Sequence, residues 1–129
     1  MGRVYSRPQT NLYSADVGRA VAFYERLGFV ATFRTPSEGT PIHVELVLDG
    51  FTLGIADVES ARRDHGLDVT SDGRGGEVCV WTDDTDAAFA DLVAQGATPM
   101  SEPHDWLADL RVAWVADPDG HPVELVQKR

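Results

Sequence analysis

The stretch DVGRAVAFYERLG, residues 16–28, is matched by a second stretch, DTDAAFADLVAQG, residues 84–96. Each begins with Asp, ends with Gly at the same distance, and carries apolar residues at helical spacing. Asp is a favoured residue at a helix N-cap, and Gly is common just after the end of a helix. The sequence therefore predicts two similar amphipathic helices, one in each half of the chain.

The segments around the two helices repeat as well. Each half has an Asp-Gly turn before an apolar strand, FTLGIA after Gly50 and HPVELV after Gly120. Strand patterns cover residues 9–14, 29–35, 42–49 and 51–57 in the first half and residues 77–82, 97–100, 110–117 and 121–127 in the second. A period of half the chain indicates two copies of one unit.

We therefore predict an α+β fold of two βαβββ modules within a single domain, residues 1–129. Module one spans about 8–57, a connecting segment with one short helix spans 58–76, and module two spans about 77–128. Each helix covers one face of its sheet and leaves the other face free. Set side by side, the free faces form a curved mixed sheet around a shared trough.

The composition is that of a soluble globular protein, with 43% hydrophobic and 25% charged residues. No apolar run reaches the roughly 20 residues of a membrane span, and the N-terminus lacks an apolar secretion signal. The lone Cys79 fits a reducing cytoplasm. A net charge of −10 argues against nucleic-acid binding and would attract a cationic small molecule, although it also serves solubility alone.

The pattern AFY-x-x-LGF at residues 22–29 and the pattern DPDG-x-x-x-EL at residues 117–125 resemble the vicinal oxygen chelate superfamily. This superfamily includes glyoxalase I, extradiol dioxygenases, fosfomycin-resistance enzymes and bleomycin-resistance binding proteins. The resemblance covers essentially the whole chain and implies a two-module fold and a homodimer. Because one fold hosts many functions, the resemblance alone does not select the activity.

In metal-dependent members of the superfamily, the ligands stand in the first and last strands of each module. The repeat puts these implied positions at Gln9, Gly54, Glu77 and Glu124. Gly54 has no side chain, and Glu77 replaces the usual His. Oxygen donors alone suit Zn²⁺, Ni²⁺ or Fe²⁺ poorly. We therefore expect no cofactor, with one divalent ion on Gln9, Glu77 and Glu124 as the alternative. No histidine stands at an implied ligand position; the chain's histidines are His43, His65, His104 and His121.

Strand alternation predicts the other residues that line the trough. These are Asn11, Tyr13, Thr52, Ala56, Cys79, Trp81, Pro122 and Val126. If Glu77 and Glu124 both face the trough, the pKa of at least one of them is raised, unless a cation or Arg111 neutralises the pair. The alternative is that Glu124 only pairs with a neighbouring strand residue. Trp106, in the predicted loop 101–110, resembles a Trp that stacks on the drug in bleomycin-binding relatives. The pattern leaves open which face Trp114 takes.

The preferred function is a non-catalytic protein that sequesters a bulky, partly aromatic natural product or antibiotic of the bleomycin, mitomycin or enediyne type, and so confers resistance. The predicted ligand-binding residues are Tyr13, Trp81, Trp106, Asn11, Cys79, Glu77, Glu124 and Arg111. The alternative is a lyase, isomerase or dioxygenase that uses a divalent metal as Lewis acid, or a metal-free enzyme with a Glu as general base. A metabolite-sensing domain ranks last, because no DNA-binding segment is appended.

Overall fold

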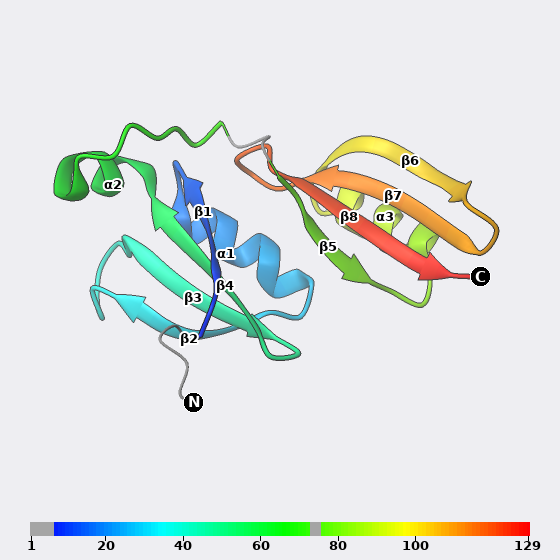
Figure 1. The fold of residues 1–129 in the computed structure, drawn as a ribbon, viewed down its shortest axis with the longest axis horizontal. Helices are drawn as coiled ribbons and strands as arrows, with labels where there is room; N and C mark the ends of the chain where they lie inside the picture. Colours follow the sequence, from blue (N-terminus) through cyan, green and yellow to red (C-terminus); the bar gives the residue numbers. More distant parts are fainter. Residues whose placement is uncertain (1–6, 73–75) are drawn as a thin grey trace, which may run out of the picture. The chain divides into compact units, whose positions relative to one another are not determined.

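The structure is a computed structural model that describes residues 7–72 and 76–129. It forms two compact units, residues 1–71 and 72–129. Both units have the order βαβββ, and the first ends with an extra helix (Figure 1). This confirms the predicted α+β fold with its duplicated module. None of the described helices is long and apolar enough to cross a membrane.

The first unit contains β1 (Thr10–Ser14), α1 (Val17–Arg26), β2 (Val30–Thr35), β3 (His43–Leu48), β4 (Phe51–Asp57) and α2 (Val58–His65). The second contains β5 (Val78–Trp81), α3 (Thr85–Ala94), β6 (Thr98–Trp106), β7 (Leu110–Ala116) and β8 (Pro122–Lys128). The two sheets have the same topology, with strand orders β1-β4-β3-β2 and β5-β8-β7-β6. In each sheet the first strand runs parallel to the last, and the other neighbours are antiparallel.

The helices begin where the sequence predicts. The carboxylate of Asp16 accepts a hydrogen bond from the N–H of Arg19, and that of Asp84 accepts one from the N–H of Ala87. Each helix packs on one face of its own sheet (Figure 1). In the first unit the fully buried ring of Tyr24 contacts the Phe23 and Phe29 rings edge to face, which holds the end of α1 against the residue that precedes β2.

Each sheet therefore has a helix-covered face and an open face. Side chains such as Leu53 and Ile55 in β4, and Val123 and Leu125 in β8, are almost completely buried on the helix-covered side. Because successive strand residues alternate between faces, the residues between them point to the open side. Gly54 in β4 and Glu124 in β8 are thus equivalent positions on the two open faces.

The largest departure from the sequence-based expectation is β6. We expected a short strand near residues 97–100 and then a loop, whereas β6 continues to Trp106. The strand lies at the sheet edge and pairs with β7 through two register shifts. An edge strand tolerates its two prolines, which have no N–H to donate to the backbone hydrogen bonds of a sheet. His104 and Trp106 consequently stand on a strand. His65 is the last residue of α2, a short helix within the connecting segment.

Candidate functional site

The open face of the second unit brings together Glu77, Cys79, Trp114 and Glu124. Cys79 of β5 and Trp114 of β7 lie directly opposite Glu124 of β8, one on each side of it. Directly opposite residues share a face of the sheet. The indole Nε1 of Trp114 donates a hydrogen bond of 3.0 Å to Glu77 Oε1. Trp114 therefore faces the open side, a point that the sequence leaves undecided.

Two carboxylates, those of Glu77 and Glu124, meet on this face. Burial raises the pKa of Glu124, and its hydrogen bond with Glu77 and the charge of Glu77 raise it further. In residues 7–72 and 76–129, neither Glu77 nor Glu124 forms an ion pair with Lys or Arg. A cation bound beside the pair would remove this repulsion and be held by both carboxylates.

The same environment acts on Cys79. Burial, together with the charges of Glu124 and Glu77, raises the pKa of the thiol to about 11. The thiol is exposed enough to meet a reagent, so the low fraction of thiolate limits its reactivity. The raised pKa of the thiol therefore argues against Cys79 as an activated nucleophile.

We therefore expect Cys79 to react slowly with iodoacetamide at pH 8. The thiolate fraction falls about 100-fold when the pKa rises from about 9 to about 11, but the more basic thiolate is more nucleophilic, which leaves the rate about tenfold below that of a free thiol. The same protein unfolded in urea is the control, and Glu124→Gln is expected to raise the rate. A native rate equal to the unfolded rate would contradict this electrostatic picture.

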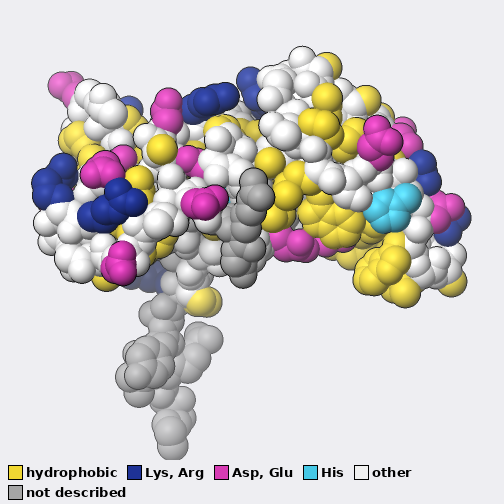
Figure 2. All heavy atoms as spheres, turned by 90° about the horizontal axis from the view of Figure 1, so that it is seen from above, with side chains coloured by type: hydrophobic (Ala, Val, Ile, Leu, Met, Phe, Trp, Pro, Cys, Tyr) yellow, Lys and Arg dark blue, Asp and Glu magenta, His cyan; other side chains and the backbone are white. Residues whose placement is uncertain are grey.

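Aromatic side chains continue the open face beyond the carboxylates. The His104 ring stacks on Trp114, with centroids 6.3 Å apart and planes 24° apart. Trp81 and Trp106 are 66% and 52% exposed. The space-filling view shows hydrophobic side chains gathered beside a histidine on this unit (Figure 2). Exposed ring faces of this kind can stack on a flat ligand.

Arg111 does not neutralise the carboxylates, which corrects one of the sequence-based alternatives. Its side chain lies on the helix-covered side, where it binds Asp86 of α3 through two hydrogen bonds of 2.6 and 2.9 Å. A third hydrogen bond, of 2.9 Å, joins it to Asp105. Arg111 alternates with its strand neighbour Val112, so it points away from the open face that carries Trp114.

The remaining predicted residues stand on the open face of the first unit. Asn11 lies opposite Gly54 and Tyr13 opposite Ala56. Tyr13 lines a cavity of about 350 Å³ between the sheet and α2. The Gln9 amide Nε2 donates to Asn11 Oδ1 at 2.8 Å and to Glu45 Oε2 at 3.4 Å.

The structure tests whether the metal-ligand positions implied by the resemblance fit an ion. A Cβ atom added to Gly54 would overlap Asn11 Oδ1, so no side chain fits there unless Asn11 moves. One oxygen of Glu77 already accepts the indole N–H of Trp114. Gly54 therefore leaves one of the four implied positions without a ligand atom, whereas Glu77 and Glu124 still offer carboxylate oxygens.

Sequence reasoning missed Glu45 as a site residue. It shares the open face of the first unit with His43, whose Nε2 is 3.3 Å from Glu45 Oε2. The signal was present in the strand IHVELVL, where His43 and Glu45 alternate with the buried Val44 and Leu46. Glu45 lies opposite Gly54 in the first sheet, as Trp114 lies opposite Glu124 in the second. Glu45 and Trp114 therefore occupy equivalent positions.

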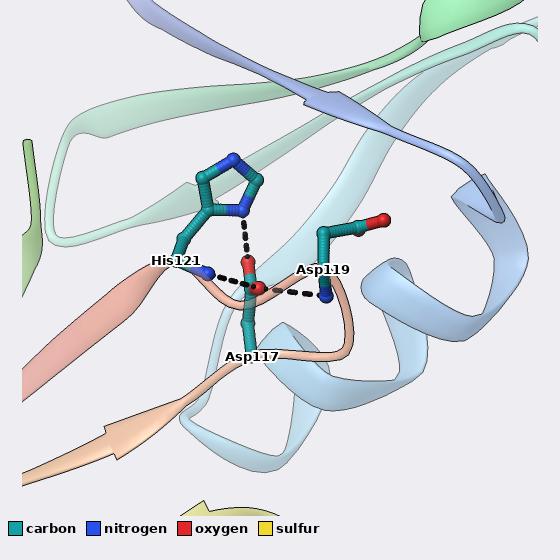
Figure 3. Close-up of side chains that lie close together, drawn as sticks. All are labelled: Asp117, Asp119 and His121. Carbon is teal, nitrogen blue, oxygen red and sulfur yellow. Dashed lines mark hydrogen bonds and ion pairs between the residues drawn. The ribbon is translucent and has the colours of Figure 1, made fainter. Parts of the chain in front are cut away.

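A second polar group lies in the β7–β8 turn. Ligand atoms of Asp117, Asp119 and His121 lie within 4.8 Å of one another. The Asp117 carboxylate accepts hydrogen bonds from the backbone N–H groups of Asp119 and His121, at 2.9 and 2.8 Å, and pairs with His121 Nδ1 at 2.8 Å (Figure 3). These contacts fix the turn of the DPDG pattern, so we assign the group a structural role.

The chain matches one known family over almost its whole length. The family model for the Glyoxalase/Bleomycin resistance protein/Dioxygenase superfamily matches residues 7–125. Among curated proteins, no significant match is found.

Three solved structures illustrate the similarity. TioX from Micromonospora sp. ML1 is 28% identical, with a TM-score of 0.71 over 96% of this chain and 100% of that one. TnmS3, an antibiotic binding protein from Streptomyces sp. CB03234, is 24% identical, with a TM-score of 0.70 over 99% and 100%. A glyoxalase-related enzyme from Fulvimarina pelagi is 23% identical, with a TM-score of 0.79 over 96% and 89%. The last two likenesses show the fold alone.

Proposed function

This chain belongs to the Glyoxalase/Bleomycin resistance protein/Dioxygenase superfamily. From the side chains of its second unit, we propose that it binds and sequesters a flat, partly aromatic, cationic natural product or antibiotic, without catalysis. The observation that carries the proposal is the pair of carboxylates, Glu77 and Glu124, beside the half-buried ring of Trp114, whose indole N–H binds Glu77. Bleomycin-, mitomycin- and enediyne-type compounds are the classes we propose. Sequestration confers resistance by lowering the free drug concentration.

The chemistry of the face supports binding over reaction. Stacking of a flat ring on an indole contributes about 0.5–1.5 kcal/mol beyond burial of area. A cationic group is attracted by the unneutralised carboxylates and by the net charge of −10. The thiol of Cys79, with its raised pKa, offers no activated nucleophile. The fold is also one on which an antibiotic binding protein, TnmS3, is built.

We expect Trp106→Ala to weaken binding of a planar antibiotic such as bleomycin by about 2- to 10-fold, the equivalent of one stacking contact. The indole is half-exposed at the end of β6, so the melting temperature should stay unchanged. Tryptophan-fluorescence titration measures the affinity. Phe51→Ala, which removes a half-exposed ring from the first unit, is the matched control. Equal affinities for Trp106→Ala and wild type would remove this indole from the site.

The unneutralised carboxylates also favour one alternative, a divalent-metal-dependent lyase, isomerase or dioxygenase. Elemental analysis of protein purified without chelators or metal-affinity columns separates the two. About one equivalent of metal per chain, lost in Glu124→Gln, would replace sequestration with the metal-dependent function. We also propose that the protein is a cytoplasmic homodimer, as the superfamily resemblance implies, and sedimentation of the purified protein tests the dimer.

A further inference from the structure

Four polar side chains converge over Gly54 on the open face of the first unit. Gln9 Nε2 lies 2.8 Å from Asn11 Oδ1 and 3.4 Å from Glu45 Oε2. His43 Nε2 lies 3.3 Å from the same Glu45 oxygen. A Cβ atom at Gly54 would overlap Asn11 Oδ1 and lie 3.1 Å from His43 Cε1. We call these four side chains the Gly54 cluster.

The glycine is what permits the cluster. Gly54 lies in β4, between β1 and β3, so Asn11 reaches over it from one side while His43 and Glu45 reach over it from the other. Glycine inside a strand weakens the strand and often marks a close approach of other groups. Any larger residue at position 54 would push the polar side chains apart.

The polar atoms lie at hydrogen-bond distances, and this spacing is also that of ligands around one ion. With metal–ligand bonds of about 2.1 Å, neighbouring ligand atoms lie about 3.0 Å apart in octahedral geometry and about 3.4 Å apart in tetrahedral geometry. The three distances within the cluster, 2.8, 3.3 and 3.4 Å, fall in or next to this range. The Gln9 amide presents either its nitrogen or its oxygen, because a half-turn exchanges the two atoms.

The charge and access of the cluster also suit a cation. In the described part of the chain, the Glu45 carboxylate forms no ion pair with Lys or Arg, although Arg7 lines the same cavity, and its hydrogen bonds are to His43 and Gln9. The side chains of His43 and Glu45 are 24% and 31% exposed, so an ion can reach them from water. Gln9 and Glu45 line one cavity, of about 560 Å³, and Asn11 and His43 line the neighbouring one under α2.

We propose that the Gly54 cluster is a binding site for a divalent transition-metal ion. The ligands are His43 Nε2 and Glu45 Oε2, completed by the amide oxygens of Asn11 and Gln9. An imidazole with oxygen donors favours Zn²⁺ or Co²⁺ over Mg²⁺ and Ca²⁺. This site shares Gln9 with the positions implied by the superfamily but differs in its other ligands, because β3 supplies two of them and the second unit supplies none. It goes beyond the proposed function, since sequestration on the second unit requires no metal.

The test is a titration of metal-free, untagged protein with Co²⁺, followed by its visible absorption. We expect one equivalent bound per chain, displaced by Zn²⁺. His43→Gln and Glu45→Gln should each weaken binding about tenfold or more, because each removes a ligand. His104→Gln and Glu102→Gln, which alter the second unit outside every ligand set considered, are matched controls and should bind as wild type does.

Two results would overturn the proposal. One is the absence of saturable Co²⁺ binding by the folded wild-type protein. The other is binding that survives in both His43→Gln and Glu45→Gln, whether or not it is lost in Glu124→Gln. Circular dichroism establishes that the variants fold, as expected for partly exposed side chains. The antibiotic titration of the same variants is independent, so failure of the metal site leaves the sequestration proposal standing.

Discussion

Replacing Asp117 with alanine is expected to lower the free energy of unfolding by about 3–5 kcal/mol, the usual cost of removing one partner from a buried charged pair. The carboxylate is 1% exposed and accepts hydrogen bonds from two backbone N–H groups and from His121 Nδ1. Without it, these donors in the β7–β8 turn lose their acceptor inside the protein. Urea denaturation of wild type and variant measures the difference.

Asp109→Ala is the matched control, because Asp109 is half-exposed and its carboxylate lies 3.6 Å from Lys128 Nζ at the surface. Its loss should cost less than about 1 kcal/mol. If Asp117→Ala were no more destabilising than Asp109→Ala, the turn would not depend on the carboxylate. The Asp117, Asp119 and His121 group would then be open to a functional assignment.

The pH dependence of this difference follows from His121. Burial opposes its charge, but the hydrogen bond and charge of Asp117 outweigh burial and raise the pKa of the imidazole. A raised pKa in the folded state contributes stability fully below the unfolded value of about 6.5 and loses it as the pH rises through the folded value. The stability advantage of wild type over Asp117→Ala should therefore shrink toward alkaline pH.

The second large effect concerns the ligand. The double variant Glu77→Gln with Glu124→Gln should bind a cationic planar antibiotic about 10- to 100-fold more weakly, equivalent to about 1.5–3 kcal/mol, the range for hydrogen bonds to charged groups. A neutral planar compound should bind almost unchanged, because a glutamine at position 77 is as long as glutamate and keeps an oxygen that accepts the indole N–H of Trp114. Titrations of both compounds by tryptophan fluorescence measure the two affinities.

A control variant separates local charge from overall charge. Glu25→Gln with Glu102→Gln changes the net charge equally at exposed positions and should leave both affinities unchanged. The double variant of the site should also be folded at neutral pH. Because the pKa of Glu124 is raised in the folded state, its ionised form opposes folding as the pH rises, and glutamine removes that cost. If the Glu25→Gln with Glu102→Gln variant lost as much affinity for the cationic compound, the effect would be one of net charge alone.

The sequence predicts most of the fold because its local signals agree with one another. The helices that begin after Asp16 and Asp84 carry cap, apolar stripe and terminal glycine together, and the structure contains both. The Asp-Gly turns likewise place β3–β4 and β7–β8 as hairpins. The repeat then identifies equivalent positions, and the strand registers put Gly54 and Glu124 at the same place in the two sheets.

The site is predicted less completely, since it depends on register and side-chain reach. The strand LRVAWVA is apolar on both faces, so alternation alone cannot orient Trp114. Arg111 is drawn to Asp86 of α3, a contact that forms only when the helix is packed on the sheet. The sequence shows that Gly54 lacks a ligand atom, whereas only the structure shows that Asn11 fills the space above it.

The central claim, that the open face of the second unit binds a flat cationic ligand, is tested most directly by titrating the wild-type protein and a Trp114→Ala variant with bleomycin. We predict saturable quenching of tryptophan fluorescence with one ligand per chain in wild type. In Trp114→Ala, which removes the ring held by Glu77, we predict a weaker affinity. Folded wild-type protein that shows no saturable quenching, or a variant that binds as tightly as wild type, would contradict the account.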